Sequence, residues 1–160
     1  LLFMGQEFAQ LREWSEEREL DWFLLAEEEH QAVQNWMRDL LHLYKKNPAL
    51  SQDEQIWEGF EWINADDAYR SIFSYVRHSK NKKKNLLFVI NFTPMTWEDY
   101  RVGVPRKKQY KLIMNSDDVK YGGTGKERPV VYKAVKKECD GRPFSFAYEL
   151  PPYGVAVFEF

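Results

Sequence analysis

The sequence of 160 residues has little cysteine and little histidine. Cys139 is its single cysteine, which excludes a disulfide within the chain and any metal site built from several thiolates, and which is compatible with a reducing cytoplasm. The three histidines, at positions 30, 42 and 78, are scattered without the spacing of metal ligands. We therefore expect no metal site and a cytoplasmic location.

Long apolar runs and a strong net charge are also missing. No stretch approaches the ~20 consecutive apolar residues that cross a bilayer, and a net charge of −2 provides no basic field for nucleic acid or an anionic membrane. The glycine-rich segment 121–127 differs from a phosphate-binding loop, because Lys120 replaces the first glycine of that motif and Glu127 replaces its Ser or Thr. We expect no cofactor, no nucleic-acid partner and no membrane partner.

Aromatic residues, in contrast, are plentiful. Phe, Trp and Tyr make up 16% of the chain, with six Trp, nine Tyr and eleven Phe. Aromatic side chains pack well in β-rich cores, and this is the commoner reason for such a composition. Aromatic faces also stack against sugar rings, so carbohydrate binding is the functional alternative.

The N-terminal part has the pattern of one barrel unit. Residues 1–4 are apolar and run into Gly5, as in a strand that is buried on both faces and ends at a ligand-facing mouth. A parallel strand needs neighbours on both sides, so we expect the chain to be a piece of a longer protein. A long loop over 5–26 then leads to a helix over 27–46, which Asn47-Pro48 ends. The apolar face of this predicted helix holds Val33, Trp36, Met37, Leu40, Leu41, Leu43 and Tyr44.

After Pro48 the apolar period changes from that of a helix to two, which is the period of a strand. Turn signals separate the apolar segments at regular spacing, which is typical of an antiparallel sandwich. We predict a mainly β chain, in which 1–48 is the final strand, loop and helix of a (β/α)8 barrel and 49–160 is a C-terminal β-sandwich. The strands are expected at 56–63, 71–77, 86–92, 100–104, 110–115, 130–135, 144–150 and 155–160.

An ordered set of motifs spans nearly the whole chain and resembles the C-terminal portion of 1,4-α-glucan (glycogen) branching enzymes, members of the α-amylase superfamily. The loop departs from a common form of that family at Leu11 and Ser15, where Gly and Asn are usual. The motifs are FMGQEF (3–8), REW (12–14), LDW (20–22), NPAL (47–50), GFEWI (59–63), DD (66–67), NFTP (91–94), YRVGVP (100–105), NSD (115–117), YGG (121–123) and LPP (150–152).

The resemblance implies an enzyme of glycogen biosynthesis that transfers a cut α-1,4-glucan chain to a 6-hydroxyl and so forms an α-1,6 branch. The superfamily carries its Asp nucleophile, Glu acid and Asp stabiliser on the fourth, fifth and seventh barrel strands, all upstream of this sequence. We therefore expect no catalytic residue here and no activity from this chain alone. By resemblance, Gln6, Glu7 and Trp14 support or line the rim of the sugar cleft, at the carboxyl end of a barrel strand. The implied partners are α-1,4-glucan or glycogen and the missing N-terminal part of the same enzyme.

Three tryptophans in the predicted sandwich, Trp57, Trp62 and Trp97, are candidates for surface contact with glucan. Trp57 and Trp62 lie five positions apart, so on an ideal strand one points to the core and the other is free to be exposed. Packing in the interior is the alternative for each of the three.

Three other interpretations remain open. The sandwich is a stand-alone α-glucan-binding module, or a structural domain that shields the barrel, or the C-terminal part of a hydrolysing amylase relative, since a shared fold does not prove the reaction type. The apolar surface of residues 1–48, which would lack the rest of their barrel, also predicts that the chain self-associates.

Overall fold

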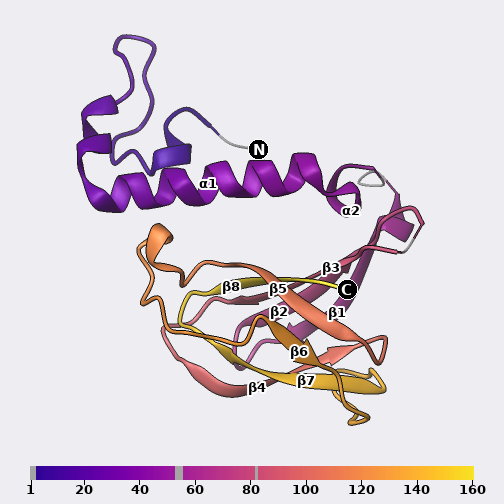
Figure 1. The fold of residues 1–160 in the computed structure, drawn as a ribbon. Coiled ribbons are helices and arrows are strands. Elements are labelled where there is room, and N and C mark those ends of the chain that lie inside the picture. The colour runs from indigo at the N-terminus through magenta and orange to yellow at the C-terminus, as the bar shows by residue number, and fades with distance from the viewer. Residues whose placement is uncertain (1–2, 53–55, 82) are drawn as a thin grey trace. The chain divides into compact units, whose positions relative to one another are not determined.

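The computed structural model describes residues 3–52, 56–81 and 83–160, and the chain divides into two compact units (Figure 1). The first unit comprises the residues up to Lys46 together with Asp117–Lys126, and the second comprises Asn47–Ser116 and Glu127–Phe160. The division predicted from sequence, 1–48 and 49–160, assigned all of 117–126 to the sandwich. In the structure this segment packs on the long helix instead.

The first unit is built on one long helix. Three glutamates in 27–29 and two lysines at its end suit the helix dipole, and the predicted helix at 27–46 is confirmed. None of its residues is fully buried, so its apolar face is only half covered in this chain. The elements of this unit are the 3₁₀ helices η1 (Gln6–Phe8), η2 (Trp22–Ala26) and η4 (Val119–Tyr121) and the α-helix α1 (Glu28–Lys46).

The predicted barrel strand at residues 1–4 is wrong where the structure describes it. Phe3 lies outside any strand and Met4 lies in a turn, while the first two residues lie outside the described part of the chain. Both side chains are exposed, at 55% and 54%. The physical reason is that a strand needs hydrogen-bonded neighbours. Every ladder between described strands is antiparallel and lies in the other unit, so Phe3 and Met4 have no parallel strand beside them to satisfy their backbone groups.

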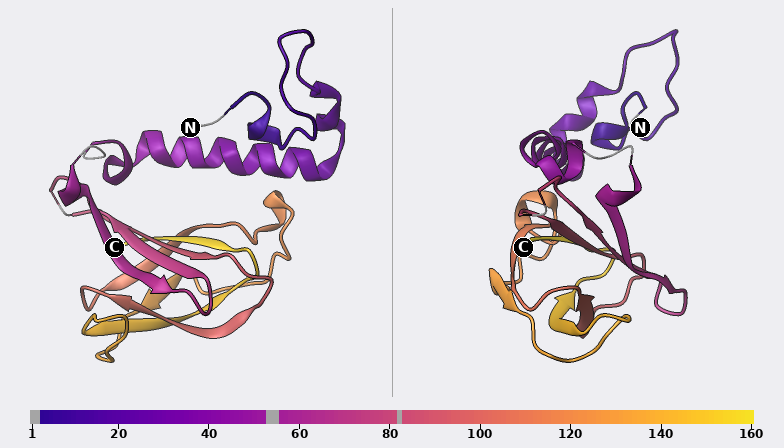
Figure 2. Two further views of the ribbon diagram at one scale, coloured as in Figure 1. Left: turned by 180° about the vertical axis from the view of Figure 1, so that it is seen from behind. Right: turned by 90° about the vertical axis from the view of Figure 1, so that its right-hand side faces the viewer.

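The second unit is an antiparallel sandwich of two sheets, as predicted (Figure 2). The larger sheet has six strands in the order β1-β2-β3-β8-β5-β6, and the smaller one pairs β4 with β7. Its elements are α2 (Pro48–Ser51), η3 (Trp57–Gly59), β1 (Phe60–Asp67), β2 (Ile72–Arg77), β3 (Leu86–Asn91), β4 (Trp97–Val104), β5 (Gln109–Asn115), β6 (Val131–Lys133), β7 (Phe144–Leu150) and β8 (Val155–Glu159).

The sandwich core lies between the facing sides of the two sheets. Alternate residues of β2 and β3, such as Val76 and Val89, point into it and are fully buried. From the smaller sheet, Phe146 and Tyr148 of β7 meet Phe158 of β8, with ring centroids 5.2 Å apart in both pairs. Burial of this apolar area, at about 25 cal/mol per Å², is the main force that holds the sheets together.

The strand predicted at 56–63 begins later than expected. Residues Trp57–Gly59 form the turn η3, and β1 starts at Phe60 and continues to Asp67 with two irregularities in its pairing to β2. The inference that Trp57 and Trp62 face opposite sides of one strand is therefore wrong, because they do not share a strand. Both side chains are exposed, at 88% and 49%.

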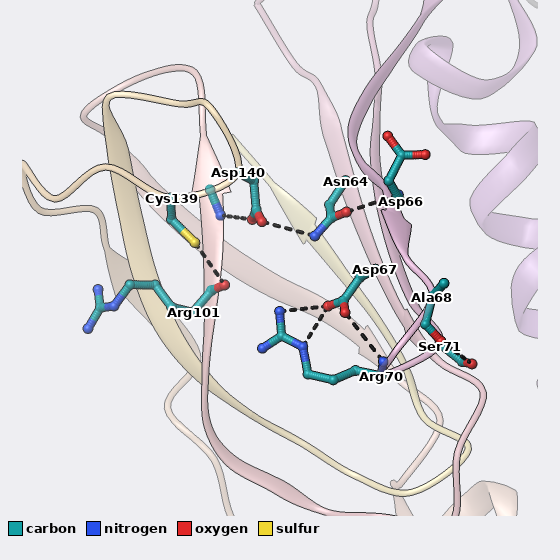
Figure 3. A network of polar contacts seen from close by, with 10 residues as sticks. Asn64, Asp66, Asp67, Ala68, Arg70, Ser71, Arg101, Cys139 and Asp140 are labelled. Carbon is teal, nitrogen blue, oxygen red and sulfur yellow. Dashed lines mark hydrogen bonds and ion pairs between the residues drawn. The ribbon is translucent and has the colours of Figure 1, made fainter.

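A polar contact joins the two sheets at one edge (Figure 3). Asp140 accepts hydrogen bonds from Asn64 Nδ2 of β1 at 3.0 Å and from the backbone N–H of Gly103 of β4 at 2.8 Å. Cys139 donates its thiol to the carbonyl of Arg101, 3.3 Å away. The backbones of Gly103 and Cys139 approach each other so closely that position 103 requires glycine, since a Cβ there would stand 2.2 Å from the carbonyl oxygen of Cys139.

Candidate functional site

The loop over residues 5–26, called the rim loop below, contains η1 and η2 and is ordered by its own charged and amide side chains. Asp21 is almost completely buried and forms a bidentate pair with Arg12, whose Nε lies 2.8 Å from Asp21 Oδ2. The hydrogen bond from Arg12 holds the pKa of Asp21 below its usual value. Gln10 accepts from the Asp21 backbone N–H at 2.8 Å and donates to the Arg12 carbonyl at 2.9 Å. These side-chain contacts, and not a sheet or a disulfide, hold the two ends of this charged loop together.

A sharp turn at Gly5 begins this loop. Gly5 has φ +84°, which favours glycine, and a Cβ there would stand 2.8 Å from Cβ of Gln10. Gln6 accepts from the backbone N–H of Phe3 at 2.8 Å, which orients its amide. His30 of α1 contacts the carbonyl of Phe8 through Nδ1 at 2.8 Å, so helix and loop are tied together within this unit.

The loop lines an open cavity of about 350 Å³. Trp14 is half buried in its wall, and its ring meets Phe3 edge-on with centroids 5.4 Å apart. Gln6 lines the same cavity, whereas Glu7 does not and lies half buried on η1. The structure thus brings together two of the three predicted rim residues. Its full lining is Phe3, Met4, Gly5, Gln6, Gln10, Leu11, Arg12, Glu13 and Trp14.

Sequence reasoning did not select Gln10 and Arg12, which line the cavity beside Trp14 and whose amide and guanidinium also form the bonds within the loop described above. The signal for Arg12 was the REW motif (12–14), in which it immediately precedes two residues of the cavity, whereas Gln10 lies outside that motif. An aromatic ring next to amide, carboxylate and guanidinium groups is chemically suited to a polyhydroxylated ligand, because rings take apolar faces and polar groups take hydroxyls.

The second candidate site is the outer face of β1, β2 and β3 in the sandwich. Phe60, Tyr75 and Phe88 stack across the three strands, with centroids 5.2 Å and 4.8 Å apart. Burial raises the pKa of the Tyr75 phenol, which stays neutral. Trp62 stands perpendicular to Phe60 and Tyr75, at 4.9 Å and 5.8 Å, and leaves 49% of its surface exposed. Its indole is therefore held in place by other rings and is open to a ligand.

The other two candidate tryptophans have different surroundings. Trp57 is exposed on η3, and its ring makes no aromatic contact with another described residue. Trp97 is half buried and packs against the sandwich core, with the Arg70 guanidinium 5.8 Å from its ring. The geometry of Trp97 resembles that of a core residue more than that of a surface platform.

Within the described ranges no group of three or more histidine, cysteine, aspartate or glutamate side chains is arranged to hold a metal ion. Across the same residues, no helix has both the length and the apolar character needed to cross a membrane.

The chain is similar over its full length to bacterial branching enzymes. It is 49% identical over 160 residues to the 1,4-alpha-glucan branching enzyme GlgB of Butyrivibrio fibrisolvens, covering 100% of this chain and 25% of that protein. It is 40% identical to GlgB 1 of Clostridium perfringens (strain SM101), covering 99% of this chain and 24% of that one. The chain thus spans about a quarter of the length of these relatives. The resemblance predicted from the motifs is confirmed.

Solved structures support the fold. A MutB F164L mutant, from crystals soaked with trehalulose, matches 80% of this chain and 18% of its own with a TM-score of 0.51 and 16% identity. At this identity the likeness concerns the fold alone. Residues 62–160 match the family described as the alpha amylase, C-terminal all-beta domain, which is most of the chain and nearly all of the sandwich. The chain belongs to this family of alpha amylase C-terminal all-beta domains.

Proposed function

We propose that the chain is the C-terminal part of a 1,4-α-glucan branching enzyme. Such an enzyme cuts an α-1,4 bond, holds the released chain as a glycosyl-enzyme and transfers it to a 6-hydroxyl of an acceptor glucan. The observation that carries the proposal is the 49% identity to a branching enzyme over 160 residues, which includes the rim loop as well as the sandwich. The family model, by comparison, matches residues 62–160 alone.

In this proposal the chain contributes architecture and glucan contact, while the catalytic carboxylates belong to the rest of the enzyme. Gln6 and Trp14 line the cavity of the rim loop, and Glu7 lies half buried on η1 outside that cavity. Trp62 is the strongest candidate for a contact outside the cleft, because its ring is exposed and fixed by two neighbours. An ordered ring binds with a smaller loss of conformational entropy.

A chimeric enzyme tests the proposal. The matching C-terminal quarter of the Butyrivibrio fibrisolvens enzyme is replaced by this chain, and amylose is the substrate. We expect α-1,6 linkages in the proton NMR spectrum and a blue shift of the iodine complex. The matched control is the same chimera with its sandwich deleted after Lys46, which we expect to lose activity.

Two results would contradict the proposal. A folded, monodisperse chimera that releases reducing ends without new α-1,6 linkages would favour a hydrolysing amylase relative. A folded chimera with no activity, when the parent enzyme is active, would show that this chain does not serve a branching enzyme.

The chain alone is proposed to be inactive. A purified sample incubated with amylose is expected to change neither the reducing ends nor the iodine spectrum. Turnover that follows the protein through further purification would show that catalytic groups are present here.

A stand-alone glucan-binding module is the second candidate function, and the exposed Trp62 favours it. The two candidates differ in affinity. This chain alone would supply only the rim of the sugar cleft and lack the other residues that converge on a bound glucan, so it is expected to bind maltoheptaose weakly. A Kd below about 1 μM, which corresponds to roughly −8 kcal/mol, would support an independent module.

The remaining partner in the proposal is the N-terminal part of the enzyme, which would cover the apolar side chains exposed on the first unit. Leu41 and Tyr44 of α1 are 50% and 40% exposed, and Phe23 is 69% exposed. Without that part, the chain is expected to self-associate. Sedimentation at increasing concentration measures this, and Leu41→Glu is expected to reduce it; a strict monomer at all concentrations would argue against it.

A further inference from the structure

The aromatic face of the sandwich continues beyond Trp62 in one direction. Phe73 of β2 lies 6.4 Å from Trp62, ring centroid to ring centroid, and Phe92 lies 5.7 Å from Phe73. Trp62 is 49% exposed at one end of this row and Phe92 is 60% exposed at the other, with the half-buried Phe73 between them. The row crosses β1 and β2 and reaches the end of β3.

Uncharged side chains make up the row and the loop at its Phe92 end. Phe73, Tyr75, Phe88 and Ile90 of this face are neutral, and the loop 92–96 that follows β3 contains no charged residue. Charge lies toward the Trp62 end, where Arg77 follows Tyr75 on the same face of β2 and Arg142 donates to the backbone carbonyl of Trp62 at 2.8 Å. The uncharged row is a distinct feature in a chain of which 30% of the residues are charged. A neutral ligand with apolar faces is therefore complementary to the row, whereas an acidic or basic partner is not.

The far end of the row is held rigidly. Asn91 is 1% exposed, and its Nδ2 donates to the carbonyls of Met95 at 2.8 Å and Pro151 at 2.9 Å. Its Oδ1 accepts from the N–H of Thr93 at 3.0 Å, and the backbone N–H of Phe92 donates to Ser71 at 3.1 Å. These bonds fix the backbone on both sides of Phe92, so the ring is presented from an ordered loop.

We propose that Trp62, Phe73 and Phe92 form one continuous track for several consecutive units of an α-glucan chain. The proposal rests on the proposed function and deepens it: Trp62 is the first contact of the track, and Phe92 extends it by further sugar units. A row of separate rings gains contact area with each added unit until the row is spanned. Affinity on the track therefore depends on the length of the glucan.

The experiment compares four variants of the full chain, Trp62→Ala, Phe92→Ala, Phe92→Trp and Tyr69→Ala. Tyr69 is the matched control, because it is an aromatic residue that is 95% exposed and makes no ring contact with another described residue. Maltose, maltotriose and maltoheptaose are titrated into each protein, and ¹⁵N chemical-shift changes give the dissociation constants. Thermal unfolding confirms that each variant is folded. Phe92→Trp keeps a ring at the end of the row.

The wild-type chain is expected to bind maltoheptaose more tightly than maltose. Trp62→Ala weakens binding of all three sugars. Phe92→Ala weakens binding of maltoheptaose at least about fivefold, which is roughly 1 kcal/mol, and leaves the affinity for maltose unchanged. Phe92→Trp restores the affinity for maltoheptaose, and Tyr69→Ala has no effect.

The outcomes separate the track from the function on which it rests. If Trp62→Ala weakens binding but Phe92→Ala does not, the track is wrong and the single contact at Trp62 stands. If a folded wild-type chain shows no shift on this face with any of the sugars, the proposed glucan contact itself fails. An equal effect of Phe92→Ala on maltose and maltoheptaose also overturns the track.

Discussion

Lys120 donates a hydrogen bond to Asp39 across 81 residues of sequence, with Nζ 2.8 Å from Oδ2. Tyr121 donates its hydroxyl to the same carboxylate oxygen at 2.5 Å, and its ring meets Trp36 edge-on at 4.9 Å. Asp39 and Trp36 lie about one turn apart on α1. One carboxylate thus holds the short helix η4 on the long helix and explains why Asp117–Lys126 belongs to the first unit.

Asp39→Asn is expected to destabilise this attachment by about 0.5–1 kcal/mol, because the ion pair is partly exposed and screened. The hydrogen bonds from Lys120 and Tyr121 lower the pKa of Asp39. A lowered pKa in the folded state means that the stabilisation is complete above the ordinary value of 3.8 and is lost as the pH falls through the lower, folded value. The measurement is urea unfolding of wild type and variant between pH 7 and pH 3.

The matched control is a double-mutant cycle with Lys120→Met. If Asp39 and Lys120 act as a pair, their effects are not additive. Additive effects, or a difference between wild type and Asp39→Asn that persists unchanged at pH 3, would contradict the pairing.

Asp21→Asn is expected to loosen the rim loop, because Asp21 is the buried partner of Arg12. Acrylamide quenching of Trp14 fluorescence, measured in a background with the other tryptophans replaced by Phe, reports the change as faster quenching. The pKa of Asp21 is lowered, so the wild-type loop keeps its order until the pH falls below the usual aspartate range. Glu16→Gln removes an exposed carboxylate of the same loop and is expected to change nothing; equal quenching in both variants would argue against the role of the pair.

Gly103→Ala is expected to destabilise the sandwich by about 3 kcal/mol or more, because the new Cβ would stand 2.2 Å from a backbone oxygen. Gly141→Ala is the comparison, since a Cβ there meets no atom within 4 Å and only the positive φ of +66° opposes it. That strain costs about 1–2 kcal/mol. Chemical unfolding ranks the two variants, and an equal loss in both would show that the close approach at Gly103 is relieved without cost.

Cys139 is expected to react slowly with thiol reagents in the folded protein. Burial raises the pKa of its thiol to about 11, and the thiolate is the reactive form. At pH 8 the rate with a disulfide reagent is expected to be at least about tenfold below that of a free thiol and to rise steeply toward pH 11. The same reaction in urea is the control, because unfolding removes the burial. Equal rates with and without urea would show that the thiol is not protected.

The sandwich was predictable because its strands are long enough to show the alternation of side chains. In β7, Phe146, Tyr148 and Leu150 point to the core and Ala147 and Glu149 do not, as the sequence alternates. The helix α1 was predictable for a similar reason, from the spacing of its apolar residues and the proline after it. The motif order also identified the family.

The contacts that define the candidate sites were not predictable from local pattern. Trp62 and Phe92 are thirty positions apart in the sequence, and the row between them exists only because β1, β2 and β3 lie side by side in one sheet. The attachment of Lys120 to Asp39 depends in the same way on a long-range approach.

Local periodicity thus determined which segments are strands and helix, because side-chain direction alternates along the backbone itself. Tertiary structure alone decided that Phe3 and Met4 form no strand, that Trp57 and Trp62 are exposed, and that Asp117–Lys126 belongs to the first unit. These features depend on whether a distant segment is present to cover a surface or to complete a hydrogen bond.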